Sequence, residues 1–297
     1  LPIGGDAFAQ EEIARPQTTY LKDVWRSFRK RKTAVFGLAV VCFMVIMVLI
    51  GPMMNDFNYY TNDYDHINEA PSAVHWFGTD ELGRDLWTRA WIGGRVSLLI
   101  AVVATIIPYI IGMTVGGISG YIGGKVDMVI MRIVDVLMGI PRMIYNILLM
   151  IVLGSGNIST LIIAFTITGW LGSARSTRGL VLQLKERDFV MASQTLGASP
   201  LRIIFKHLLP NTLGIAVVGM ASSIPGIIFA EAFLSFIGLG IAPPNPSWGQ
   251  LIKAASSVFK TYPYQFLIPC LCISITMLCC YLMGDGLRDA LDPRLRS

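Results

Sequence analysis

Long apolar segments alternate with shorter polar ones along the whole chain. Six of them reach or approach the roughly 17–25 residues that a helix needs to cross the hydrocarbon core of a bilayer. They are Ala34–Met54, Val96–Ile122, Met128–Leu153, Ile158–Ala174, Leu213–Ile237 and Phe266–Met283. The pattern predicts an all-α integral membrane protein with six transmembrane helices.

The polar segments between these spans divide the chain into further regions. Residues 1–33 form an N-terminal region, 34–54 the first span, 55–95 a loop, 96–284 the core of five spans, and 285–297 a tail. Just before the first span, apolar residues recur at helical spacing among basic ones, at Leu21, Val24, Trp25 and Phe28. This spacing predicts an amphipathic helix that lies in the membrane interface.

Composition supports a lipid environment rather than a soluble domain. Hydrophobic residues make up 54% of the 297 residues and charged residues 14%, whereas soluble domains carry about 25% charged residues. The five cysteines all lie in predicted spans without the spacing of a zinc or redox site, and buried thiols pack as small apolar groups. A water-facing surface would need more charge than this chain carries.

The distribution of Lys and Arg predicts the orientation in the membrane, because cytoplasmic loops carry the excess of these residues. One set of loops holds 17 of them, namely Arg15, Lys22, Arg26, Arg29, Lys30, Arg31, Lys32, Lys125, Arg175, Arg178, Lys185, Arg187, Arg202, Lys206, Arg288, Arg294 and Arg296. The other set, residues 55–94 and 238–265, holds only Arg84, Arg89, Lys253 and Lys260. Both termini are therefore predicted to be cytoplasmic. The net charge of +5 is explained by anionic membrane lipid, without nucleic acid.

Residues 175–210 form a long cytoplasmic loop with clear helix boundaries. Gly197 ends a first short helix where a left-handed residue is favoured, and Ser199 and Pro200 suit the N-cap and first position of a second helix. Such a helical hairpin is either a simple connector or a docking element for a partner.

The sequence of this loop resembles the EAA loop of ABC importer permeases. Met191-Ala-Ser-Gln-Thr-Leu-Gly197 is followed after nine residues by His207-Leu-Leu-Pro210. Ala192, Gly197, Leu209 and Pro210 match the family pattern, whereas Met191 and Ser193 stand where the family usually has glutamate and alanine. The resemblance implies contact with a partner ATPase through Met191, Ala192, Ser193, Leu196, Gly197, Ala198 and Ser199.

Five further segments resemble the C-type subunit of dipeptide and oligopeptide permeases: Phe77–Asp85, Gly120–Asp127, Phe233–Gly240, Pro246–Gly249 and Gly284–Pro293. The resemblance implies a type I ABC importer fold with cytoplasmic coupling helices. It also implies a homologous B-type permease, two ATP-binding subunits that hold ATP and Mg²⁺, and an extracytoplasmic peptide-binding protein. The chain would be a permease subunit in the bacterial cytoplasmic (inner) membrane, importing oligopeptides or instead dipeptides, nickel chelates or glutathione.

Charged residues inside the spans are the candidates for a translocation path, since such residues are costly in lipid. Glu231 is expected either to face the path or to pair with a basic residue. Arg142, after Pro141, is expected either to meet a peptide's carboxyl terminus or to pair with Glu231. Arg132 and Asp135 share a helical face and are expected to pair with each other.

Catalytic chemistry and metal binding are not indicated. Gly123-Gly124-Lys125-Val126 lacks the first glycine and the Ser or Thr of a phosphate loop, and His66, His75 and His207 are isolated. The chain is thus predicted to have no catalytic residue, metal or cofactor of its own. An ion-driven secondary transporter is a less favoured alternative, because only Asp135 and Glu231 are acidic residues within spans.

Overall fold

The structure is a computed structural model that describes residues 20–291, with side chains from residue 22. Residues 1–19 and 292–297 of the predicted tails, and the side chain of Leu21, lie outside the described part. The helices are α1 (Tyr20–Lys30), α2 (Lys32–Ile50), η1 (Gly51–Met53), α3 (Leu86–Ile122), α4 (Gly124–Met138), α5 (Arg142–Leu153), α6 (Ile158–Leu184), α7 (Asp188–Thr195), α8 (Pro200–Arg202), η2 (Ile203–Leu208), α9 (Leu209–Phe236), α10 (Trp248–Ala255) and α11 (Pro263–Leu291).

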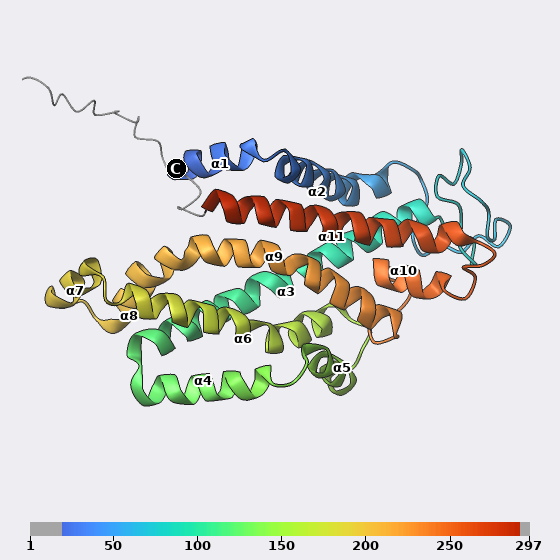
Figure 1. Ribbon diagram of the computed structural model, residues 1–297. Coiled ribbons are helices and arrows are strands. Elements are labelled where there is room, and N and C mark those ends of the chain that lie inside the picture. The colour runs from blue at the N-terminus through green and yellow to red at the C-terminus, as the bar shows by residue number, and fades with distance from the viewer. Residues whose placement is uncertain (1–19, 292–297) are drawn as a thin grey trace, which may run out of the picture.

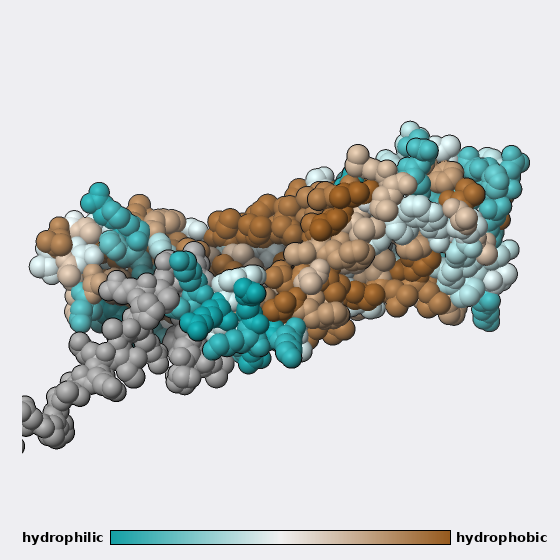
Figure 2. Space-filling view, turned by 90° about the horizontal axis from the view of Figure 1, so that it is seen from above, coloured by the Kyte–Doolittle hydropathy of each residue, from teal (hydrophilic) through white to brown (hydrophobic). Residues whose placement is uncertain are grey.

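The long helices lie roughly side by side in a flat bundle, with α2 and α11 along one edge and α4 along the other (Figure 1). Apolar side chains cover the middle of the bundle and polar ones gather at its two ends (Figure 2). This distribution is what a bilayer requires, because the hydrocarbon core offers no partners for polar groups. The predicted all-α membrane architecture is confirmed.

Within the described residues, five helices are long and apolar enough to cross a membrane, and α4 with α5 forms a sixth crossing only as a bent pair. The prediction of one helix over Met128–Leu153 is wrong, since α4 and α5 meet at 87°. Pro141 has no N–H to continue the helix and disfavours helical geometry at the residue before it. The break therefore falls at Gly139–Pro141 and directs the start of α5 toward the inside of the bundle.

Several helices extend beyond the predicted spans. α3 begins at Leu86 rather than Val96, because the Asp85 side chain caps it by accepting a hydrogen bond from the Thr88 N–H at 2.8 Å. α6 continues to Leu184 and α11 to Leu291, past the predicted ends of the apolar runs. Helices thus project from the apolar band into the polar ends, where hydropathy alone no longer marks them.

The segment between η1 and α3 is a folded cap rather than an open loop. Asp80 contacts the Arg84 guanidinium at 2.8 Å, and His75 contacts Asp85 at 3.0 Å. Arg89, fully buried in the first turns of α3, donates from Nη1 to the Tyr59 carbonyl oxygen at 2.6 Å. The cap closes the end of the bundle where α10 also lies (Figure 1).

The predicted amphipathic helix is present as α1. Its Val24 and Phe28 side chains are buried in a small cluster with Ala290 of α11, whereas Trp25 is exposed. Arg31 and Asp289 add an ion pair next to this cluster. The apolar face of α1 is therefore divided between α11 and the surroundings, and α1, α7 and the end of α11 share one end of the bundle (Figure 1).

Candidate functional site

A cavity of about 720 Å³ lies in the middle of the bundle, between α3, α5, α6 and α9. Pro108 lies within α3 beside it, and the bend at Pro141 brings the beginning of α5 to its edge. Its lining is mainly apolar and small, with hydroxyl groups from three of the helices at Thr105, Tyr109, Thr168, Ser173, Ser176, Thr177, Thr212, Ser222 and Ser223. A space of this kind, between helices at mid-span, is where transporters hold their cargo.

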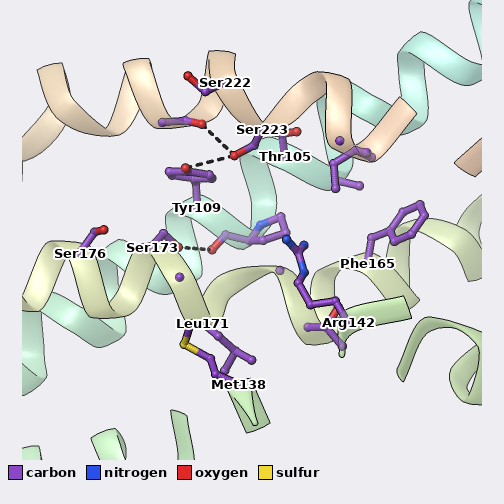
Figure 3. Close-up of a pocket in the computed structure, with 18 of the residues that line it drawn as sticks. Thr105, Tyr109, Met138, Arg142, Phe165, Leu171, Ser173, Ser176, Ser222 and Ser223 are labelled. Atoms are coloured by element: carbon purple, nitrogen blue, oxygen red, sulfur yellow. Dashed lines mark hydrogen bonds between the residues drawn. The ribbon is translucent and has the colours of Figure 1, made fainter. Parts of the chain in front are cut away.

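Arg142 carries the one charge among the cavity-lining residues that the structure describes. It is the first residue of α5, and Figure 3 shows its side chain extending into the cavity. Among the described residues no ion pair or hydrogen bond of its guanidinium is found. The structure thus places this predicted path residue on the cavity wall, where no residue from 20 to 291 provides an ion-pair partner.

The cavity also contains polar residues that the sequence had not singled out. Tyr109 and Ser223 share a hydrogen bond of 3.3 Å across α3 and α9 (Figure 3). The Thr168 hydroxyl donates to the side-chain oxygen of Asn146 at 3.1 Å and joins α6 to α5. An amide and paired serines inside otherwise apolar spans are the signal that would have identified Asn146, Ser222 and Ser223.

Glu231 lies elsewhere, fully buried between α3, α9 and α10. Its two carboxylate oxygens accept hydrogen bonds from Ser97 at 2.8 Å and from Ser235 at 2.7 Å. Ser97 in turn accepts from the Trp248 N–H at 3.2 Å, which connects the cluster to α10. The neighbouring Ala230 lines the cavity, but the Glu231 side chain does not.

Two predicted pairs are contradicted by this arrangement. Within residues 20–291, Glu231 makes no ion pair with Arg142. Arg142 lines the cavity, whereas Glu231 does not and accepts hydrogen bonds from two serines instead. Asp135 pairs with Arg175 of α6 instead of Arg132, because α4 packs along α6 and brings that side chain within reach.

Asp127 joins three helices near the end of the bundle that carries α7. Its carboxylate accepts two hydrogen bonds from the Arg178 guanidinium, both at 2.5 Å, and one from Ser119 at 2.6 Å. Bidentate, charge-assisted contacts of this kind are among the stronger hydrogen bonds. They attach α4, which has few other contacts, to α3 and α6.

We expect Asp127→Asn to destabilise the chain by about 1–2 kcal/mol, since charge-assisted hydrogen bonds contribute about 1.5–3 kcal/mol and Arg178 retains some exposure. The measurement is the thermal unfolding of the purified chain in detergent. Asp135→Asn is the matched control, because its pair with Arg175 is half-exposed on both sides and should contribute only tenths of a kcal/mol. Equal losses from the two variants would contradict this view of Asp127.

The predicted coupling residues lie together at the projecting end of the bundle. They run from α7 through a turn at Gly197, which has a φ of 78°, to Ser199, whose hydroxyl accepts from the Arg202 N–H at 3.4 Å and caps α8. Met191, Ala192, Leu196, Gly197 and Ser199 are exposed, and Leu196 is 87% exposed. Phe189, Met191 and Leu201 are exposed in the same short segment, and exposed apolar side chains gathered in this way mark a surface suited to a partner.

The buried side of the same segment is packed into the bundle. Val190 of α7 shares a cluster with Ile203, Ile204 and Leu208 of η2, and this cluster also holds Val181 of α6 and Met113 of α3. α7 is therefore anchored to helices that line the cavity. A displacement of α7 would be carried to the cavity walls through packed side chains.

Comparison with known proteins agrees with this geometry. Residues 112–297 match the family model described as binding-protein-dependent transport system inner membrane component, and residues 19–71 match the N-terminal TM domain of oligopeptide transport permease C. The dipeptide transport system permease of Bacillus subtilis is 45% identical over 96% of this chain and 89% of its own length. The oligopeptide permease OppC of Bacillus subtilis is 43% identical, over 100% of this chain and 97% of that protein, and OppC of Escherichia coli K12 is 39% identical, over 93% and 91%.

These matches confirm the resemblance found in the sequence. Components of such systems are multi-pass permeases of the inner membrane that work with a binding protein and with an ATPase on a separate chain. They carry no catalytic site or cofactor of their own. Together with the cavity and the projecting helical segment, these matches show which family the chain belongs to. It is a member of the binding-protein-dependent transport system inner membrane components, the permeases of ABC importers.

Proposed function

We propose that this permease imports peptides and forms one half of their path, with a homologous B-type permease as the other half. The observation that carries the proposal is the central cavity, which the helices of one chain surround only in part. At one edge of the bundle, α4 and α5 (Figure 1) also keep large apolar side chains exposed, among them Val129, Ile133 and Leu148. The named cargoes of the relatives, dipeptides and oligopeptides, support the substrate class. Peptides need a space that tolerates varied side chains, and small hydroxyl-rich walls provide one.

The remaining partners follow from the same proposal. Two ATP-binding subunits, holding ATP and Mg²⁺, bind the segment from Asp188 to Ser199. An extracytoplasmic peptide-binding protein binds the cap (residues 54–85) and the neighbouring α10. The excess of Lys and Arg at the end with α7 supports cytoplasmic termini, with anionic lipid beside the basic residues of α1.

Coupling then works by rigid-body displacement. Closure of the ATPase dimer moves α7, and the cluster around Val190 transmits the movement to α3, α6 and α9. Because packed interiors deform little, the helices move as units and open the cavity to one side at a time. The methionine at position 191 leaves the contact with the ATPase apolar where the family usually offers a carboxylate.

We expect Leu196→Asp to lower peptide-stimulated ATP hydrolysis at least about tenfold, because a buried apolar contact at the ATPase would become an unpaired charge. The side chain is 87% exposed in the isolated chain, so the fold should be unaffected. Leu196→Met is the control and should retain near-normal coupling. Normal ATPase coupling in Leu196→Asp, with intact assembly, would show that this turn is only a connector.

The proposed function itself is tested by reconstitution in liposomes. The chain, its B-type partner, the ATPase subunits and the binding protein should together take up labelled peptide only with ATP. Competition with dipeptides, glutathione and nickel chelates would identify the favoured cargo. Recovery of the chain without a second permease or ATPase, together with uptake that needs no ATP, would refute the proposal.

A further inference from the structure

Among the residues of the described chain that line the cavity, Arg142 is the single cation and no side chain is acidic. The two acidic residues within the predicted spans already have partners. Glu231 accepts hydrogen bonds from Ser97 and Ser235, and Asp135 forms an ion pair with Arg175. A charged side chain at membrane depth is retained only where water, a ligand or a partner compensates it. Arg142 is therefore free, within the described residues, to meet a negative group that enters the cavity.

The position of Arg142 suits this role. The break at Gly139–Pro141 places it at the beginning of α5, and its side chain reaches across the space below α3 (Figure 3). The guanidinium presents a planar set of donors that matches a carboxylate with two parallel hydrogen bonds. Around it, the hydroxyl groups of Thr105, Tyr109 and Ser223 are neutral donors and acceptors, which suit amide groups without regard to side-chain identity.

We propose that Arg142 receives the carboxylate of the peptide during translocation and so makes the permease selective for anionic peptide ends. The inference rests on the proposed function and adds the chemistry of the recognised group. Every unmodified linear peptide carries a C-terminal carboxylate, so one arginine can serve cargoes of different sequence. An acidic side chain offers the same chemistry, and the experiment separates these two sources.

The test compares uptake by the full reconstituted complex of a neutral peptide with a free C-terminus, of its C-terminal amide, and of that amide with one glutamate added. Each is measured for the wild type, Arg142→Gln and Arg142→Lys at the same concentration of the same loaded binding protein. Any preference of the binding protein for one peptide is then the same for every permease variant, so differences between variants come from the permease. Lys125→Gln is the control, since it removes an exposed cation outside the cavity.

The wild type should favour the free carboxylate over the amide. Arg142→Gln should lower that preference about tenfold, as expected for the loss of one charge-assisted contact, whereas Arg142→Lys should keep part of it and Lys125→Gln all of it. Rescue of the amide by an added glutamate would extend recognition to acidic side chains.

An unchanged preference in Arg142→Gln would overturn the inference. So would failure of Arg142→Gln to assemble with the second permease, because the compensating carboxylate would then belong to that subunit. Absence of ATP-dependent uptake in the wild type would instead refute the proposed peptide import. The ratio between free and amidated peptide thus tests Arg142 separately from the function as a whole.

Discussion

Replacing Glu231 with leucine should destabilise the permease by on the order of 4 kcal/mol and prevent recovery of a folded complex. The Ser97 and Ser235 hydroxyl groups, both buried, would lose their acceptor, and each unsatisfied buried polar group costs about 1–3 kcal/mol. The cluster also connects α3 and α9 to α10 through the Trp248 N–H. The loss would therefore loosen the end of the bundle that the cap covers. Size-exclusion profiles and thermal unfolding in detergent are the measurements.

Glu231→Gln is the matched control for this prediction. The amide keeps one acceptor oxygen at nearly the same position, and its NH₂ group can donate hydrogen bonds to the serine oxygens. It should retain most of the stability and transport. If Glu231→Leu folds as well as the wild type but transports nothing, Glu231 acts on the path, as the alternative from the sequence proposed, rather than in packing.

Replacing Gly116 with leucine should abolish folding, and even alanine should destabilise the chain by about 1–3 kcal/mol, as overpacking does. A Cβ at Gly116 would lie 2.2 Å from the Ala174 carbonyl oxygen, which belongs to the backbone of α6 and has no side-chain freedom to withdraw. Gly112 meets the same helix, where its Cβ would lie 1.9 Å from the Ser173 hydroxyl oxygen. In a membrane, such close helix approach is a main source of association.

Gly179→Ala provides the control within the same pair of helices. It lies in α6 with open space around the position of a Cβ, so alanine should be neutral or stabilise the helix by up to about 1 kcal/mol. Thermal unfolding of the three variants side by side makes the comparison. Equal melting of Gly116→Ala and Gly179→Ala would mean that α3 and α6 are not in close contact at Gly116.

The helices were predictable because each depends on local pattern, and the same holds for a helix face made of small residues such as Gly112 and Gly116. An apolar run of sufficient length identifies a span, and Gly112 and Gly116, at i and i+4, mark one side of a helix without any knowledge of its neighbour. Pro141 was visible in the sequence, but the bend at this residue was missed, because the hydropathy of a segment does not depend on the direction of its backbone. The cap and α10 were missed for a related reason, since contacts that fix their places join residues distant in sequence. Gln265 donates to the Thr79 carbonyl oxygen in the cap, and Trp248 of α10 donates to the Ala90 carbonyl oxygen.

Composition and spacing were enough to predict a membrane protein, to place five of its spans and to identify the positively charged loops and the loop with the permease signature. These properties follow from the composition and spacing of each segment, which do not depend on how distant helices pack. The sixth predicted span, Met128–Leu153, is instead the bent pair of α4 and α5. Which charges find partners depended on packing: within residues 20–291, Arg142 lies on the cavity without an ion pair, while Glu231 accepts hydrogen bonds from Ser97 and Ser235. The reason is physical: a charge in a span must be compensated, but the partner is set by which faces of distant helices meet, and that choice is made by packing.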